Sequence, residues 1–151
     1  MAVFSQTGGS NGGSYAQYFT FRLTVWEKSY SIDGNYSIVG RKGELISGQY
    51  GKFSQYYGDW SVNTGGQSSS GGAYYAITTA NTSLVLFEDE ITVYHNDDGS
   101  KTISCSASLD MAGGTYSPRR FLCIWRFSFN NNTKGFKCYS NRCKYRQCIN
   151  N

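Results

Sequence analysis

Several features that mark common protein classes are scarce or missing in this sequence. Its 151 residues include one proline and one histidine, and only one of its five cysteines, Cys105, precedes Pro118. No apolar run approaches the length that a bilayer-spanning segment needs, so we expect no membrane insertion. The N-terminal segment lacks the basic stretch and the apolar core of a signal peptide, so we expect no export by the general secretory route.

Acidic residues are missing from the end of the chain. Residues 1–118 contain 6 Lys/Arg and 10 Asp/Glu, whereas residues 119–151 contain 8 Lys/Arg, four cysteines and no acid. Glycine changes in the opposite sense, with 17 before Pro118 and one after it. So abrupt a change indicates that the last part of the chain needs an explanation of its own.

What the sequence does contain is typical of one all-β domain. Aromatic residues make up 17% of the chain, and it has 18 glycines. Phe19, Phe21, Leu23 and Val25 alternate with polar or mixed residues, as in a half-buried antiparallel strand. We expect further strands at residues 36–39, 44–47, 50–60, 74–79 and 83–87, a surface loop at 65–72, and a flexible segment at 1–14. Turn signals about every 8–12 residues favour an antiparallel β-sandwich, immunoglobulin-like or jelly-roll-like.

Residues 91–109 are predicted to form a β-hairpin, with arms at 91–95 and 101–109 around a polar turn. The Asp-Gly pair in the turn is a hairpin signal, because glycine tolerates the positive φ of a tight reversal. Pairing Val93 with Ile103 places the apolar residues of both arms on one face.

Three blocks of the sequence resemble, in the same order, tail-associated minor structural proteins of siphoviruses and prophages of Gram-positive bacteria. The most specific block is HNDDGSKTI, in the predicted hairpin. The second block consists of Arg22, Leu23, Val25, Glu27, Ser29, Tyr30, Ser31, Ile32, Asn35, Ser37 and Val39. The third consists of Gly58, Trp60, Val62, Gly65, Gly66 and Gln67. The resemblance covers roughly residues 15–118.

The resemblance implies a β-rich module of the tail tip or a tail fibre that serves assembly and host-surface attachment. It implies other tail proteins as partners, a homo-oligomer in the full-length form, and a place in the virion tail after synthesis in the host cytoplasm. No catalytic residue is implied, so we expect no enzyme, no cofactor and no nucleic-acid partner.

Residues 119–151 admit several explanations. Four cysteines among basic and aromatic residues suggest a zinc or nucleic-acid module, but the spacing C-x14-C-x4-C-x4-C lacks a close cysteine pair and a histidine. A disulfide framework needs an oxidising compartment, which nothing here suggests. A disordered basic tail conflicts with the apolar run Phe121, Leu122, Ile124, Trp125, Phe127 and Phe129.

Translation out of frame is the leading explanation for residues 119–151. A shift of one nucleotide permits a strand-like sequence that contains TTIPRAS and resembles how the family continues after its first module. The chain then divides into a flexible segment (1–14), a β-sandwich module (15–118) and an out-of-frame segment (119–151). On this hypothesis the last strands are missing and the hairpin's sheet has an exposed edge. The gene must show a single-base insertion or deletion near codons 118–119.

Four residues are predicted to build the turn of the hairpin: His95, Asn96, Asp98 and Gly99. A catalytic histidine needs a nucleophile, and no serine or cysteine motif accompanies His95. Asp97-Asp98-Gly99 lacks the ligand spacing of a calcium loop, so we expect no metal site there.

Aromatic residues are the best candidates for ligand binding, because their faces stack on the apolar faces of sugars. The candidates for binding glycan are Tyr50, Tyr56, Tyr57, Trp60, Tyr74 and Tyr75. Alternation along strands predicts that half of them enter the core instead, Trp60 in particular.

The acidic run Glu88-Asp89-Glu90 suggests a second class of function. Carboxylates so close together can bind a cation, or act with another carboxylate in glycoside hydrolysis, although a solvated turn is the simpler interpretation. A cell-wall glycan-active enzyme or a carbohydrate-binding module is therefore the alternative function. An enzyme of this kind requires two carboxylates that face one groove.

Overall fold

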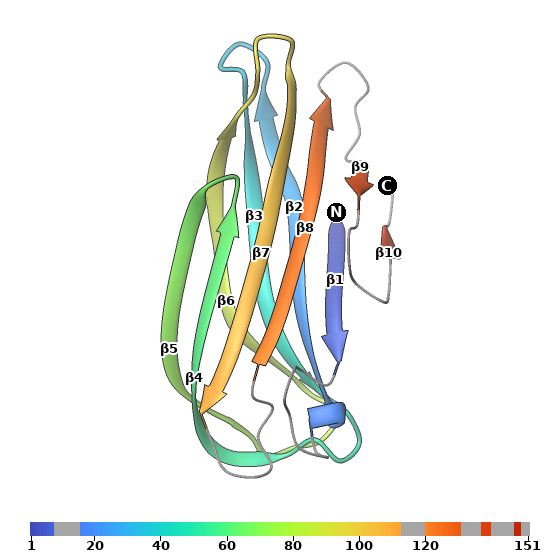
Figure 1. Ribbon diagram of the computed structural model, residues 1–151, viewed down its shortest axis with the longest axis vertical. Coiled ribbons are helices and arrows are strands. Elements are labelled where there is room, and N and C mark those ends of the chain that lie inside the picture. The colour runs from blue at the N-terminus through green and yellow to red at the C-terminus, as the bar shows by residue number, and fades with distance from the viewer. Residues whose placement is uncertain (8–15, 113–119, 131–136, 140–146, 149–151) are drawn as a thin grey trace.

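The alternating segments form the expected antiparallel β-sandwich in a computed structural model of the chain, which describes residues 1–7, 16–112, 120–130, 137–139 and 147–148. The elements are β1 (Ala2–Thr7), η1 (Ala16–Tyr18), β2 (Phe19–Ser31), β3 (Tyr36–Ser47), β4 (Phe53–Thr64), β5 (Gln67–Ile77), β6 (Ser83–Tyr94), β7 (Ser100–Ala112), β8 (Arg120–Asn130), β9 (Lys137–Tyr139) and β10 (Gln147–Cys148). They form a first sheet of order β10-β1-β2-β3-β6 and a second sheet of order β5-β4-β7-β8-β9 (Figure 1). In this described part, no helix is long and apolar enough to cross a membrane.

The core lies between the two sheets and is built from alternating residues of both. In β2 the side chains of Phe19, Phe21, Leu23 and Val25 are fully buried, as their alternation predicts. The second sheet contributes buried Val62, Ile103, Cys105, Ala107, Leu109 and Met111. Burial of these apolar surfaces is the main force that holds the sheets together.

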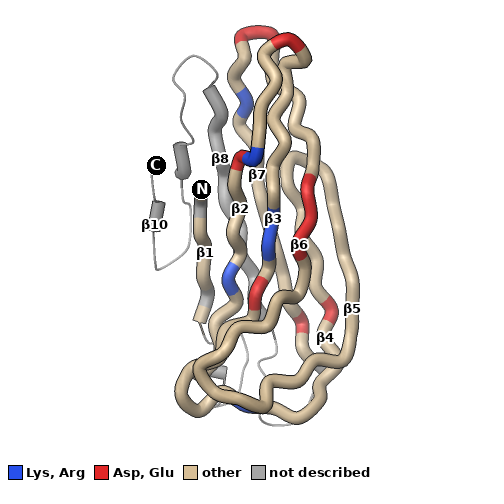
Figure 2. The backbone as a smooth tube through the Cα atoms, turned by 180° about the vertical axis from the view of Figure 1, so that it is seen from behind, with Lys and Arg blue, Asp and Glu red and all other residues tan. Residues whose placement is uncertain are grey.

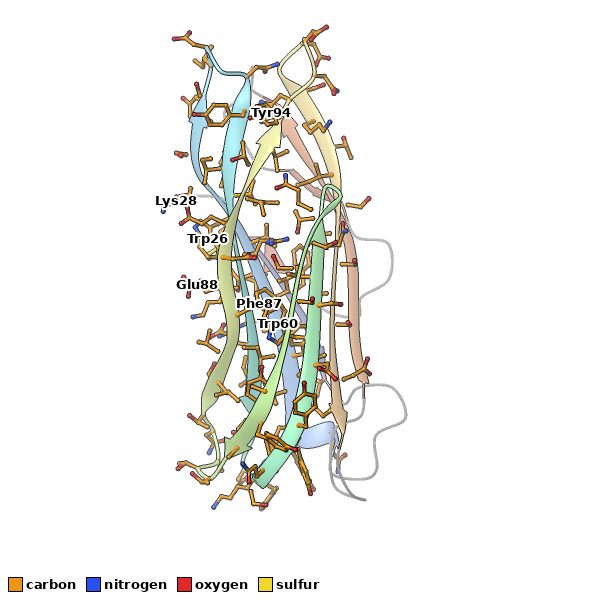
Figure 3. All side chains as sticks on the ribbon, turned by 90° about the vertical axis from the view of Figure 1, so that its left-hand side faces the viewer. Trp26, Lys28, Trp60, Phe87, Glu88 and Tyr94 are labelled. Atoms are coloured by element: carbon orange, nitrogen blue, oxygen red, sulfur yellow. The ribbon has the colours of Figure 1, made fainter. Side chains whose placement is uncertain are left out.

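Two glycines and two aromatic rings connect the sheets near the middle of the sandwich. Phe87 of β6 lies over Gly43 of β3, and Trp60 of β4 lies over Gly71 of β5, so closely that a Cβ atom on either glycine would overlap the ring. The two rings stack with centroids 4.5 Å apart and an interplanar angle of 29° (Figure 3). The absence of glycine side chains therefore lets the rings bridge the two layers.

β4 and β5 form a tight hairpin in a region where composition predicted a loop. Gly65 and Gly66 have φ values of 59° and 86°, and a two-residue turn of type I′ requires positive φ at both positions. Residues 67–72, expected in a surface loop, belong instead to β5 and pair with β4. Their Ser/Gly composition is therefore that of a strand with small side chains.

Residues 91–109 do not form the expected hairpin. β6 pairs with β3 and β7 pairs with β4 and β8, so Val93 and Ile103 belong to different sheets. The predicted inward face is nevertheless confirmed, because Ile91, Val93, Ile103 and Cys105 are all buried. The pairing was wrong because a short turn can also connect two strands that face each other across the core.

Strands at both ends extend the sandwich beyond its expected limits. β1 pairs with β2 and buries Phe4, so residues 2–7 are not the flexible segment that was expected. β8 pairs with β7 from Ser100↔Asn130 to Asp110↔Arg120. The sheet therefore continues past residue 118, and β7 is not the exposed edge that missing strands would have left. Residues 8–14, and those of 119–151 outside β8, β9 and β10, lie outside the described residues.

A buried arginine connects the first sheet to β5. Arg41 of β3 is fully buried and donates from Nε and Nη2 to the carboxylate of Asp89 at 2.8 and 2.5 Å. It also donates to the carbonyl oxygen of Gln67 at 3.1 Å and to Ser69 Oγ at 2.8 Å. Ser69 donates to Asp89 at 2.7 Å, and the Gln67 side chain donates to the carbonyl oxygen of Thr92 at 2.5 Å. The network holds β5 against β6.

Gly43→Ala is expected to destabilise the sandwich. The added Cβ would overlap the Phe87 ring, which Trp60 holds from the other side, so we expect a loss of about 2 kcal/mol in the free energy of unfolding. Gly48→Ala is the control, since its Cβ would meet the Tyr18 carbonyl oxygen at an ordinary contact distance of 3.4 Å. Urea denaturation compares the two, and equal stabilities would show that the Phe87 ring moves aside freely.

Asp89→Asn is expected to leave the buried charge of Arg41 without a counter-ion. Breaking a buried ion pair from one side destabilises strongly, so we expect a loss of about 3 kcal/mol in the free energy of unfolding. Glu88→Gln, at an exposed position of the same strand, is the matched control and should change stability by less than about 0.5 kcal/mol. Similar losses in both variants would contradict a special role for Asp89.

The same pair predicts how stability depends on pH. Burial raises the pKa of Asp89, but hydrogen bonds from Arg41 and Ser69 lower it by more. The net pKa is therefore below the ordinary 3.8. Because the folded pKa is depressed, the stabilisation is present above about pH 3.8 and is lost as pH falls through the lower, folded value. Denaturation curves of the wild type and Asp89→Asn should therefore converge in acid.

Candidate functional site

The six aromatic candidates divide between the inside and the outside of the sandwich. Successive side chains of a strand point to opposite faces, so Tyr56 and Tyr57 separate, as do Tyr74 and Tyr75. The inward group, packed against the core, consists of Tyr56, Trp60 and Tyr75. The exposed group consists of Tyr50, Tyr57 and Tyr74, at 60%, 38% and 68% exposure. Only the exposed group offers ring faces to a ligand.

Tyr57 and Tyr74 form a pair on the outer face of the second sheet. They are partners in the register of β4 and β5, and their rings meet edge to face with centroids 5.3 Å apart. Tyr50 is not part of this pair, since it lies in the connection between β3 and β4 and contacts Tyr18 at 5.4 Å. The structure thus brings together two of the three exposed candidates.

A shallow cleft adjoins this pair on the same face. It has a volume of about 530 Å³ and is lined by Asp59, Trp60, Ser61, Ser70, Gly71, Gly72, Ser108 and Asp110, from β4, β5 and β7. Gly71 and Gly72 provide no side chains, which leaves the β5 side of the cleft open. A Cβ atom on Gly72 would overlap both the Asp59 carboxylate and the Tyr57 hydroxyl. Glycine at this position therefore gives these two groups the space in which they lie.

Two carboxylates face the cleft from neighbouring strands. Asp59 of β4 and Asp110 of β7 are register partners, a position in which Cβ atoms are about 5 Å apart. On its other side Asp110 is the register partner of Arg120 in β8. The charge of Asp59, together with a hydrogen bond between the two side chains, raises the pKa of Tyr57 above its ordinary value of 10.0. Tyr57 is thereby joined to the acidic end of the cleft.

Hydroxyl groups cover the middle of the cleft. Ser61 and Ser108 are register partners whose Oγ atoms are 2.8 Å apart, and Ser70 is the partner of Ser61 on β5. Serine hydroxyls both donate and accept hydrogen bonds, and carboxylates accept them. The face therefore combines aromatic rings with the polar groups that recognise a polyhydroxyl ligand.

His95 is buried and belongs to an internal hydrogen-bond chain. Ser37 Oγ donates to Glu27 Oε1 at 2.5 Å and lies 2.9 Å from His95 Nε2. The hydroxyl has only one proton, which goes to Glu27, so Nε2 must be the donor to Ser37. Burial lowers the pKa of His95 below its ordinary value of 6.5. Since Ser37 is fully buried, a substrate cannot reach this serine, and this chain of hydrogen bonds is structural.

The predicted turn residues do form a turn between β6 and β7. Gly99 N donates to the Asn96 carbonyl oxygen at 2.8 Å, and Gly99 has a φ of 73°. Asp98 Oδ1 accepts from Ser100 N at 2.8 Å and from Ser100 Oγ at 2.6 Å. The His95 side chain bonds to Ser37 of β3, so its contact connects the turn to the first sheet.

The acidic run Glu88-Asp89-Glu90 is not the solvated turn that was expected. All three residues lie within β6, where Asp89 points inward to Arg41 and Glu90 forms an exposed ion pair with Lys28. Among the described residues, no group of three or more His, Cys, Asp or Glu is placed to hold a metal ion. The side chains of the four C-terminal cysteines, Cys123, Cys138, Cys143 and Cys148, lie outside the described residues.

The polar lining of the cleft was missed in the sequence. Asp59 and Asp110 are far apart along the chain, and only the β4–β7 register makes them neighbours. Ser70 and Gly72 lie in the segment that was expected to be a loop. The available signal was the Gly65-Gly66 turn, which defines the β4–β5 hairpin and its register.

Comparison with known families gives a match over most of the chain. A family model described as "Siphovirus protein of unknown function (DUF859)" matches residues 10–131. The matched region runs from before β2 to the end of β8, and it crosses residue 118, where the out-of-frame segment was expected to begin. None of the curated proteins matches the chain, and none of the solved structures matches it either.

Proposed function

The chain belongs to this siphovirus family, and on that basis we propose that it is a non-enzymatic structural module of the phage tail. A phage structural protein with an all-β sandwich suits a rigid part of the virion. Our proposal places it at the tail tip or in a tail fibre, with other tail proteins as partners and the host cytoplasm as its place of synthesis. Its function there would be attachment to the host surface.

The outer face of β5, β4 and β7 is the surface that supports attachment. Tyr57 and Tyr74 offer aromatic surface beside a cleft lined by serines and two carboxylates. Sugars combine apolar ring faces with hydroxyl edges, so aromatic stacking and polar acceptors are both used in their recognition. This juxtaposition is the observation on which the proposal rests.

The charge of the cleft restricts the class of glycan that it can bind. The carboxylate of Asp59 lines the cleft, and no Lys or Arg is among the residues described in its lining. Carboxylates repel phosphate and carboxylate groups of a ligand but accept hydrogen bonds from hydroxyls. We therefore propose a neutral or amino-sugar polysaccharide of the host cell wall as the ligand, in preference to a polyanionic one.

Tyr74→Ala should weaken glycan binding, with Tyr94→Ala as a matched control. Tyr74 and Tyr94 are equally exposed, at 68% and 67%, and each meets a cross-strand tyrosine edge to face. Tyr94 belongs to the first sheet, however. Loss of one stacking ring is expected to weaken binding about tenfold. A glycan array and pull-down with purified cell walls, using the full chain, measure the effect.

Two results would count against this proposal. Equal binding by the two tyrosine variants would exclude the outer face of the second sheet as the binding surface. A folded wild-type chain that binds no cell-wall glycan would favour a role in tail assembly alone.

A glycan-active enzyme is the second candidate, because the cleft contains the acidic pair that such an enzyme needs. Retaining glycosidases hold two carboxyl groups about 5–5.5 Å apart, which is close to the distance between the Cβ atoms of cross-strand partners. Release of reducing ends from cell-wall glycan, abolished by Asp59→Asn and Asp110→Asn but not by Asp97→Asn, would establish the enzyme. We expect no release from any of them.

The out-of-frame origin of residues 119–151 stays a prediction, which the gene sequence tests. The first part of this segment forms β8, which pairs with β7, and the family match extends over it to residue 131. Zinc or nucleic-acid binding through the same segment is a lesser alternative. Metal analysis of the purified chain would support it if zinc were found in stoichiometric amount.

A further inference from the structure

Both sheets end on the same side of the sandwich in a strand with one partner. Among the described strands, β5 pairs only with β4, and β6 pairs only with β3 (Figure 1). The outward edge of such a strand presents backbone N–H and C=O groups that another strand can bind. Natural proteins usually protect such edges against pairing.

The edge at β6 is protected by charge, whereas the edge at β5 is not. β6 contains Glu88, Asp89 and Glu90, and two copies of this strand would bring like charges together. β5 has the sequence QSSSGGAYYAI, without a charged residue or a proline. Figure 2 shows the same contrast, with red along β6 and none along β5. Of the two edge strands β5 and β6, it is β5 that lacks the features that prevent pairing of identical strands.

β5 is also held in a fixed position before any partner arrives. Its first residues are bonded to Arg41, Asp89 and Thr92 through Gln67 and Ser69. A preorganised strand loses little conformational entropy when it pairs, which favours binding. Most of its residues are exposed, and Ile77 is the one that is buried.

We propose that two copies of this chain pair through β5, antiparallel about a twofold axis, and join their second sheets into one continuous sheet. Strand addition at an exposed edge is a common mode of association, and a twofold contact uses the same surface on both copies. The absence of charge makes β5 complementary to itself. Its length of 11 residues provides pairing along a whole strand.

The sequence of β5 fits a register centred on Gly72. In this register Gly72 faces its own copy, Ser70 faces Tyr74, and Ser68 faces Ala76, all on the outer face. On the inner face Gly71 lies opposite Ala73. Each tyrosine therefore meets a serine of the other copy, since Ser69 faces Tyr75 in the same register. The bulkiest opposed pair is Gln67 with Ile77, at the ends of the strand. The dimer would place two candidate glycan-binding faces side by side on one sheet, which would add avidity.

Ala73→Lys tests the dimer without reference to glycan. Ala73 is exposed near the proposed axis, so a lysine on each copy would bring two positive charges together there. Ser104→Lys, at an exposed position of the interior strand β7, adds the same charge to the same sheet away from the edge. Light scattering during gel filtration should give two copies for the wild type and Ser104→Lys, and one copy for Ala73→Lys.

A crosslink tests the register and does not depend on how Ala73→Lys folds. The double variant Ser70→Cys/Tyr74→Cys should form a disulfide-linked dimer on a non-reducing gel, because opposed residues are within disulfide reach. Neither single variant should crosslink beyond the wild-type background. A wild type that stays monomeric at micromolar concentration, or an Ala73→Lys variant that stays dimeric, would overturn the proposal. Failure of the double variant to crosslink would overturn the register.

Discussion

The charge of Arg41 must be neutralised inside the sandwich, and much of the architecture follows from how this is achieved. A fully buried guanidinium is stable only with partners for its charge and its donors. Asp89 supplies the charge from β6, and Ser69 and the Gln67 carbonyl group supply acceptors from β5. The Arg41 guanidinium therefore holds together β5 and β6, two edge strands that share no backbone pairing. By positioning β5, it also positions the outer face on which the cleft lies.

Alternation predicted which way side chains point, but it could not predict which strands pair. The burial of Val93 and Ile103 followed correctly from their spacing, while their predicted pairing failed because the two strands belong to different sheets. Whether a short turn makes a hairpin or crosses between sheets depends on contacts with β3 and β4, which are distant in sequence. Local pattern thus determines faces, and long-range packing determines neighbours.

The candidate site shows the same limit. Tyr57 and Tyr74 could be selected from the sequence as aromatic residues, yet their separation from Tyr56 and Tyr75 needed the strand faces. The sequence did not predict Asp59 and Asp110 as a pair, because nothing local connects them. Their proximity arises from the β4–β7 register alone. Composition was misleading at Gly71 and Gly72, since small residues suggested a loop where they instead accommodate Trp60, Tyr57 and Asp59.

Glycine has a double role in this fold, and the two roles connect stability to the surface. At Gly71 the missing side chain makes space on the inner face for Trp60, whose stacking on Phe87 joins the sheets. At Gly72, one residue later, it makes space on the outer face for Tyr57 and Asp59. Adjacent strand residues point to opposite faces, so one Gly-Gly pair serves both the core and the cleft. A side chain at either position would alter only one face, which makes the two roles separable by single substitutions.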